Sequence, residues 1–222
     1  MSRMRLHNED VLVIGLGRFG GAVATELHRL GNRVTAVELD PELAESHLGR
    51  VGRIVQGDAT SVQLVEELRP SAFSGCVLAI GSSVEASVLA AVNLIDGDAK
   101  KVWAKAVSPE HARILNRIGV HKVLSPEIES GKRLAHLVGG KLMDYIEFDD
   151  DFAIVKMAPP QEAVGFTLGQ SSIRSKYGVT IVGVKSPGQD FTYARPETKV
   201  HSDDLIIVSG PTALIERMAA RP

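Results

Sequence analysis

The stretch that decides the fold is VLVIGLGRFGGAVATELHRLG, residues 11–31. It joins the apolar run VLVI to the glycine loop GLGRFG, residues 15–20. In such a loop Gly15 permits the tight turn, Gly17 lets the backbone approach a pyrophosphate, and Gly20 lets the next helix pack closely on the strand. The N-terminus of that helix then faces the anion. The stretch therefore predicts a strand, a phosphate-binding loop and a helix.

The residues after the loop decide how the motif is read, because a lone glycine motif is weak evidence. Apolar residues continue at helical spacing up to Gly31, which ends the helix, and residues 34–37 are typical of a second strand. That strand ends at Glu38, 18 residues beyond Gly20. An acid there is placed to accept hydrogen bonds from an adenosine ribose, and its charge would repel a 2′-phosphate. The alternative is a glycine turn followed by an exposed acid.

Bulk properties argue against several classes of partner. The chain has 222 residues, enough for one large domain or two smaller ones, and a formal net charge of −2. It has no basic block, which argues against nucleic acid as the main partner. No apolar run approaches the roughly 18–20 residues that cross a bilayer, and the N-terminus MSRMRLHNED lacks the apolar core of a signal peptide. We expect a soluble, cytoplasmic chain without direct membrane insertion, whose single cysteine, Cys76, is a small core residue.

Strand and helix patterns alternate well beyond the first unit. Such alternation predicts an α/β, Rossmann-like, doubly wound parallel sheet, whose ligands bind in the crevice at the carboxyl ends of the strands. The further strands are predicted at residues 53–56, 75–80, 101–105 and 121–124, and the helices between them at residues 61–68, 83–95 and 109–118.

Three charged residues fall at those strand ends. Arg18 lies inside the glycine loop, where one charge-assisted hydrogen bond, worth about 1.5–3 kcal/mol, can separate nucleotides by roughly ten- to a hundredfold. Asp58, in the segment GDAT at residues 57–60, either reaches an adenine or ribose edge or caps the helix that follows. Lys105 either meets phosphate charge or is a solvated edge lysine.

Glu127 follows Ser125 and Pro126, where another helix is expected to begin. A serine cap, a proline at the first position and an acid in the first turn all suit a helix start, which by itself explains the glutamate. The functional alternative is a ligand for a hard cation, because magnesium is held by one or two carboxylates together with nucleotide phosphates.

The apolar stripe after Glu127 predicts a helix that runs to Ile146 and buries one face. A helix that leaves a finished Rossmann unit can cross to a second subunit. From Phe152 a small α/β domain follows, with no Cys/His metal spacing and no nucleophile elbow, which favours an interaction or regulatory module over an enzyme. Its strands are predicted at residues 153–155, 179–184 and 205–208, and its helices at residues 168–177 and 212–219.

Six segments together resemble the RCK family, the regulators of potassium conductance that act as cytosolic gating subunits of Trk and Ktr potassium uptake systems. They are VLVIGLGRFGGAVATELHRLG, AVELD, GDAT, VWAKA, GVHKVLSPE and IRSKYGVTIVGV, in that order along nearly the whole chain. The resemblance implies a nucleotide-binding domain with a crossover helix at residues 1–146 and a C-terminal RCK domain at residues 147–222. It also implies a regulator without catalytic activity, held at the inner face of the membrane by its partner.

The resemblance further implies the ligands and the assembly. ATP would favour the conducting form of a membrane-embedded potassium-translocating subunit and ADP the closed form, with homodimers assembled into an octameric ring. Glu127 matches the acid linked to Mg²⁺ or another divalent cation. The implied nucleotide contacts are Gly15, Gly17, Arg18, Phe19, Gly20, Glu38, Asp58, Ala59, Thr60 and Lys105.

Related C-terminal domains bind cyclic di-AMP at a dimer interface, and Arg174 and Pro196 match the family positions for it. Residues 164–172, which include Gly165 and Gly169, depart from the more apolar pattern of such binders. Three alternatives remain open: a Trk-type regulator that senses NAD(H), a regulator of a different transporter, and an NAD-dependent oxidoreductase.

Overall fold

The structure, a computed structural model, describes residues 9–139, 141–148 and 151–220. The chain divides into two compact units, Met1–Glu127 and Ile128–Pro222. Within the described ranges, no helix is both long enough and apolar enough to span a bilayer.

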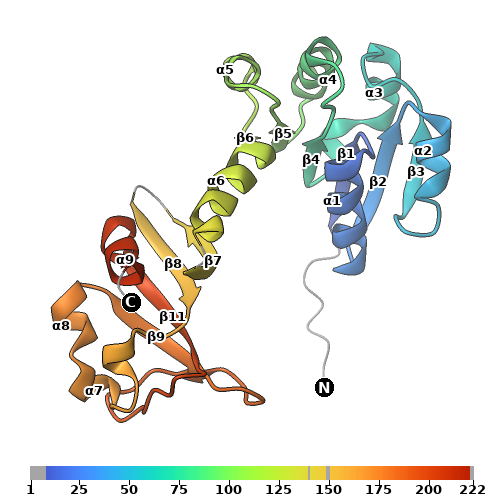
Figure 1. Ribbon diagram of the computed structural model, residues 1–222. Helices are drawn as coiled ribbons and strands as arrows, with labels where there is room; N and C mark the ends of the chain where they lie inside the picture. The colour runs from blue at the N-terminus through green and yellow to red at the C-terminus, as the bar shows by residue number, and fades with distance from the viewer. Residues whose placement is uncertain (1–8, 140, 149–150, 221–222) are drawn as a thin grey trace. The chain divides into compact units, whose positions relative to one another are not determined.

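The first unit is a six-stranded parallel sheet in the order β3-β2-β1-β4-β5-β6 (Figure 1). The predicted doubly wound sheet is therefore confirmed. The order reverses at β1, which has β2 on one side and β4 on the other, so the switch point lies where the glycine loop follows β1. The strands are β1 (Asp10–Ile14), β2 (Arg33–Glu38), β3 (Arg53–Gln56), β4 (Gly75–Leu78), β5 (Val102–Lys105) and β6 (Lys122–Leu124).

Helices cover the two faces of this sheet unequally. Leu12 and Ile14 belong to the cluster formed with α3, α4 and α5, whereas the alternate residues Val11 and Val13 pack with α1. The helices are α1 (Arg18–Arg29), α2 (Pro41–Ser46), α3 (Val62–Leu68), α4 (Val84–Asp96) and α5 (Pro109–Ile118), with a 3₁₀ turn at Pro70–Ala72.

The α1 face stays open beyond β1. A groove of about 490 Å³ lies between the apolar side of α1 and the sheet, where Val77 of β4 and Trp103 of β5 form part of its lining. Glu9, Asn32 and Ser74 also line it. The first unit thus carries a second concave surface at the amino ends of its strands, away from the edge at which the glycine loop lies.

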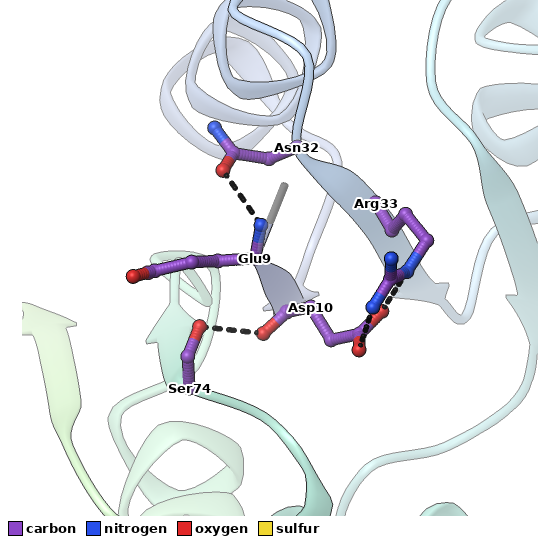
Figure 2. Close-up of polar contacts among 5 residues, drawn as sticks. All are labelled: Glu9, Asp10, Asn32, Arg33 and Ser74. Atoms are coloured by element: carbon purple, nitrogen blue, oxygen red, sulfur yellow. Dashed lines mark hydrogen bonds and ion pairs between the residues drawn. The ribbon is translucent and has the colours of Figure 1, made fainter. Parts of the chain in front are cut away.

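Polar contacts fix the amino ends of the central strands, as Figure 2 shows. Arg33 donates two hydrogen bonds to the Asp10 carboxylate, at 2.6 and 2.5 Å, in the register that pairs these two residues. The Ser74 hydroxyl donates to the Asp10 carbonyl at 2.8 Å, and the Glu9 N–H donates to Asn32 Oδ1 at 3.4 Å. The Arg33 hydrogen bond holds the pKa of Asp10 below its ordinary value.

The second unit is a five-stranded antiparallel sheet in the order β10-β9-β11-β8-β7, packed around a core that includes Tyr177, Ile206 and Ile215. This confirms a separate, small α/β domain. Its strands are β7 (Leu142–Glu147), β8 (Phe152–Met157), β9 (Thr180–Lys185), β10 (Thr192–Tyr193) and β11 (Leu205–Pro211). Its helices are α6 (Pro126–Val138), which begins at the junction, α7 (Leu168–Ser171), α8 (Ile173–Tyr177) and α9 (Thr212–Ala219), with a 3₁₀ turn at Gln161–Ala163.

The prediction of one helix running to Ile146 is wrong. Helix α6 ends at Val138, before Gly139, and residues 142–147 form β7, which pairs with β8. Glycine disfavours continuation of the helix, and Leu142 and Tyr145 bury their side chains in the core of the second sheet. A domain boundary after residue 146, as the family resemblance implies, would separate β7 from the strand with which it pairs.

Candidate nucleotide site

The glycine loop has the backbone geometry that a phosphate site needs. Gly15 has φ +89°, in the left-handed region that favours glycine, and its N–H donates to the Val37 carbonyl at 2.8 Å. A Cβ on Gly20 would overlap the Gly15 carbonyl oxygen and lie 2.7 Å from the Ala79 Cβ, so α1 packs tightly on the loop. A Cβ on Gly17, by contrast, would have no heavy atom of the described residues within 4 Å. The space is therefore open at the loop position that starts α1.

Glu38 at the end of β2 is 8% exposed and binds the glycine loop directly. Its Oε2 accepts the Leu16 N–H at 2.5 Å, and its Oε1 accepts the Asp40 N–H at 3.0 Å. The alternative of an exposed acid is therefore wrong. Sequence reasoning placed Glu38 at a ribose but missed that the same carboxylate fixes the loop.

Asp58 lies exposed in the turn after β3, and it does not cap α3. Its Oδ1 accepts the Thr60 N–H at 2.9 Å and the Thr60 hydroxyl at 2.8 Å. The N-cap of α3 is Ser61, whose hydroxyl accepts the Leu64 N–H at 3.4 Å. The helix-cap alternative for Asp58 is thus wrong, and its carboxylate sits at the carboxyl edge of the sheet.

Asn93 of α4 is a contact that sequence reasoning missed. Its side-chain amide donates to the Ala59 carbonyl at 3.2 Å and to the Thr60 carbonyl at 3.0 Å. The sequence carries no signal for it, because the two segments are more than thirty residues apart and only the packing of α4 joins them.

Lys105 and Glu127 form an ion pair at the same edge. Lys105 Nζ lies 2.6 Å from Glu127 Oε1, and the Lys105 side chain is 14% exposed against 64% for Glu127. Lys105 is therefore not a solvated edge lysine. Its Nζ also lies 5.9 Å from the centroid of the Phe19 ring, close to the limit for a cation–π contact.

Two basic side chains act on one acid beside the glycine loop. The Lys105 hydrogen bond and, to a smaller extent, the charge of Arg18 hold the pKa of Glu127 below its ordinary value. Glu127 is therefore ionised at neutral pH. The structure thus brings Arg18, Phe19, Lys105 and Glu127 together beside the glycine loop.

The donor set at Glu127 bears on the divalent cation. Among the described residues, no group of three or more His, Cys, Asp or Glu side chains could hold a metal ion. A single carboxylate fits magnesium only where nucleotide phosphates supply further oxygens.

Elsewhere in this unit, Cys76 is fully buried, as expected, and burial raises the pKa of its thiol to about 12.

The two candidate residues of the second unit are exposed and lie on neighbouring elements. Arg174 belongs to α8, and the Pro196 carbonyl accepts the N–H of Gly169 in α7 at 2.9 Å. A Cβ at Gly169 would lie 3.2 Å from that carbonyl oxygen, which gives a packing reason for a glycine in this stretch.

Comparison with known proteins places both units in one family. Residues 11–126 match the family model of the TrkA-N domain, and residues 152–221 match that of the TrkA-C domain. The chain is 29% identical over 214 residues to Ktr system potassium uptake protein A of Bacillus subtilis (strain 168), covering 96% of each chain. It is 30% identical over 209 residues to Ktr system potassium uptake protein A of Vibrio alginolyticus, covering 94% of this chain and 95% of the relative.

Solved structures show the same fold. The GsuK RCK domain superposes with a TM-score of 0.67 at 17% identity, covering 100% of this chain and 49% of that one. The GsuK channel bound to NAD superposes with a TM-score of 0.67 at 18% identity, covering 100% of this chain and 41% of that one. This chain thus spans about half the length of these solved relatives or less. With a TrkA-N domain, a TrkA-C domain and the same fold over its whole length, the chain belongs to the RCK family.

Proposed function

We propose that this chain is a KtrA/TrkA-like regulatory subunit of a potassium uptake system. The relatives that support this are named potassium uptake proteins, and they match from end to end. The chain would bind a nucleotide and gate a membrane-embedded potassium-translocating partner. In this proposal the chain performs no catalysis. It lies in the cytoplasm and is held at the membrane by its partner.

One observation carries the nucleotide part of the proposal. A single edge of the first sheet presents the open glycine loop, the Glu38 carboxylate, and the cluster of Arg18, Lys105 and Glu127. Backbone N–H groups at the start of α1 suit phosphates, and Glu38 suits a ribose without a 2′-phosphate. The ligand that fits these groups is an adenosine di- or triphosphate.

Gating by ATP and ADP requires differential contacts. A ligand shifts a conformational equilibrium only through different affinities for the two states. We propose that Arg18 meets the terminal phosphate, and that the Lys105–Glu127 pair opens or tightens with the charge of the nucleotide. Mg²⁺, held by Glu127 and the phosphates, would supply the positive charge that offsets the triphosphate.

NAD(H) is the second candidate ligand. The GsuK channel has been solved bound to NAD, and NAD shares its adenosine and pyrophosphate with ADP. Glu38 is compatible with either nucleotide, because both carry a free adenosine 2′-hydroxyl. Arg18 and Lys105 beside the glycine loop supply two positive charges that suit the more anionic ATP.

The experiment is a competition among ATP, ADP, NAD and NADH for the purified chain, with and without magnesium. Tight binding of ATP and ADP together with weak binding of NAD(H) supports the ATP/ADP switch. Preferential binding of NADH supports a Trk-like sensor. If none of them binds, the proposed function is wrong. Potassium uptake by cells that express the chain with a Ktr-type translocating subunit then tests gating.

The proposal includes homodimers assembled into an octameric ring. Helix α6 is fully described and has no buried residue, although Leu134 and Val138, one helical turn apart, form an exposed apolar stripe. The open α1 face of the sheet is a second uncovered apolar surface. Both surfaces are expected to be buried against further copies of the chain.

Cyclic di-AMP is proposed as a ligand of the second unit through Arg174 and Pro196. Two-fold ligands suit two-fold interfaces, since each subunit offers the same residue to one of two equivalent phosphates. Calorimetry with cyclic di-AMP tests this, with Arg174→Ala as the loss variant. An absence of heat for the unaltered protein rejects the second site and leaves the first untouched.

A further inference from the structure

Helix α4 places one amide where it reaches the turn at the end of β3. The side chain of Asn93 is half-buried and donates to two successive carbonyls, Ala59 at 3.2 Å and Thr60 at 3.0 Å. Neighbouring positions of α4 carry the small buried residues Ala90 and Ala91, which bring the helix close to the sheet. The amide thus joins α4 to the turn by two hydrogen bonds.

The turn has only a few other ties. Its start is held by the Gly57 N–H, which donates to the Glu38 carbonyl at 2.9 Å. Its interior is closed by Asp58, whose Oδ1 accepts from Thr60. The two hydrogen bonds between Asp58 and Thr60 shape the turn but do not attach it to another element. The Ala59 side chain packs into the core of the unit, and Asn93 is the polar side chain that fixes the two carbonyls at the far end of the turn.

We propose that Asn93 is a positioning residue for adenine recognition, an inference that rests on the proposed nucleotide function. By holding the Ala59 and Thr60 carbonyls against α4, it keeps the exposed Asp58 carboxylate at the carboxyl edge. A carboxylate there accepts a hydrogen bond from the adenine 6-amino group and repels the guanine 6-oxo group. Asn93 acts through Asp58 and does not itself contact the nucleotide.

A purely structural role for Asn93 would lower affinity for every nucleotide alike. A positioning role alters the preference between bases, which is the ratio of the dissociation constants for ATP and GTP. The two variants are Asn93→Leu, which removes both donors, and Asn93→Asp, which is nearly isosteric and replaces the donors with an acceptor. The matched control is Asn116→Leu, the same change on the exposed side of α5.

The experiment measures ATP and GTP affinities by calorimetry for the unaltered chain, these variants, Asp58→Ala and the double variant. We expect the Asn93 variants to bind ATP about tenfold more weakly with a smaller change for GTP, since loss of two hydrogen bonds to the turn corresponds to that scale. We expect the double variant to be no worse than Asp58→Ala alone, because residues that act through one another are not additive.

The outcomes separate this inference from the proposed function. If the unaltered chain binds no nucleotide, both fail. If it binds ATP but the Asn93 variants keep its ATP-to-GTP ratio, or if the two losses add fully in the double variant, the positioning role alone is overturned. Should Asn93→Leu not fold, Asn93→Asp decides the matter. A changed ratio in the Asn116→Leu control would also overturn it.

Discussion

Individual side chains at the carboxyl edge of the first sheet already make contacts that serve the fold. Glu38 uses both carboxylate oxygens to hold backbone N–H groups, so a ribose must share them. Lys105 is mostly buried and pairs with Glu127, and its Nζ lies 5.9 Å from the centroid of the Phe19 ring. Asp58 is bound to its own turn. Substitutions here therefore affect binding and loop geometry together, which calls for matched controls.

Arg18 provides the first residue-scale prediction. Replacement by alanine should lower the affinity for ATP by roughly ten- to a hundredfold and the affinity for ADP by less, because one charge-assisted hydrogen bond to the terminal phosphate is lost. Titration calorimetry with both nucleotides measures this. The control is Arg50→Ala, an exposed arginine after α2. Equal losses for ATP and ADP would remove Arg18 from its proposed role.

The glycine loop provides a second prediction, from two glycines in different surroundings. Gly20→Ala should lower the free energy of unfolding by about 1–3 kcal/mol, because its Cβ would meet backbone and Ala79. Gly17→Ala should leave stability nearly unchanged, since its φ of −57° suits alanine and its Cβ meets open space. It should weaken nucleotide binding by filling that space. Urea unfolding and calorimetry check both, and an equal loss of stability would contradict the loop geometry.

At the scale of elements, the start of α5 shows how a buried side chain holds a helix end. His111 is 1% exposed, its N–H donates to the capping Ser108 hydroxyl, and its Nδ1 accepts the Val107 N–H at 3.3 Å. In the described part of the chain, its Nε2 has no hydrogen-bond partner. Burial lowers the pKa of His111 from 6.5, so the imidazole of the folded state is neutral at neutral pH.

A pH dependence of stability follows. The unfolded state binds a proton on this histidine more readily than the folded state, so stability rises with pH where the two differ. The contribution of neutral His111 to the free energy of unfolding is complete above about pH 6.5. It is lost as the pH falls toward the lowered pKa of His111 in the folded state, with a slope of at most about 1.4 kcal/mol per pH unit. Denaturant unfolding between pH 8 and 5 should therefore show a shallower decline for His111→Asn, whose side-chain oxygen can accept from Val107.

The control for that measurement is His28→Asn, because His28 is exposed at the end of α1. Its pH profile should match that of the unaltered protein. Parallel profiles for His111→Asn and the unaltered protein would show that His111 does not control stability in this range.

The elements also show where sequence patterns suffice. The helices at 109–118 and 212–219 and the strand at 53–56 were predicted at their observed bounds. Ser108 and Gly119 mark the ends of the first helix, and Gly52 and Gly57 flank the strand. Helix α2 was missed, although Asp40 caps it and Pro41 starts it. The predicted helix at 168–177 is broken at Ser172, which has φ +52°. Neither the break nor β7 is visible in apolar spacing, and β7 is set by its pairing with β8.

At the scale of the whole molecule, the uncovered surfaces require partners. Leu134 and Val138 of α6 are 58% and 75% exposed, and monomers rarely expose extended apolar patches. We predict that the chain forms dimers or larger assemblies, and that Leu134→Glu together with Val138→Glu lowers its mass in solution. Size-exclusion chromatography with light scattering measures this.

Lys132→Glu on the same helix is the control, because it adds a negative charge outside the apolar stripe. It should leave the mass unchanged. A monomeric unaltered chain, or a double variant of unchanged mass, would contradict burial of α6 between copies.

The sequence by itself determined the parallel sheet, the glycine loop and the family, because glycine spacing and alternating apolar runs are local signals. It also singled out Arg18, Lys105 and Glu127 as candidates. Only the tertiary structure decided that Lys105 pairs with Glu127, that Glu38 holds the glycine loop and that Asn93 holds the turn at Asp58. These contacts join residues more than twenty positions apart, and no periodicity in the chain records which side chains its packing brings together.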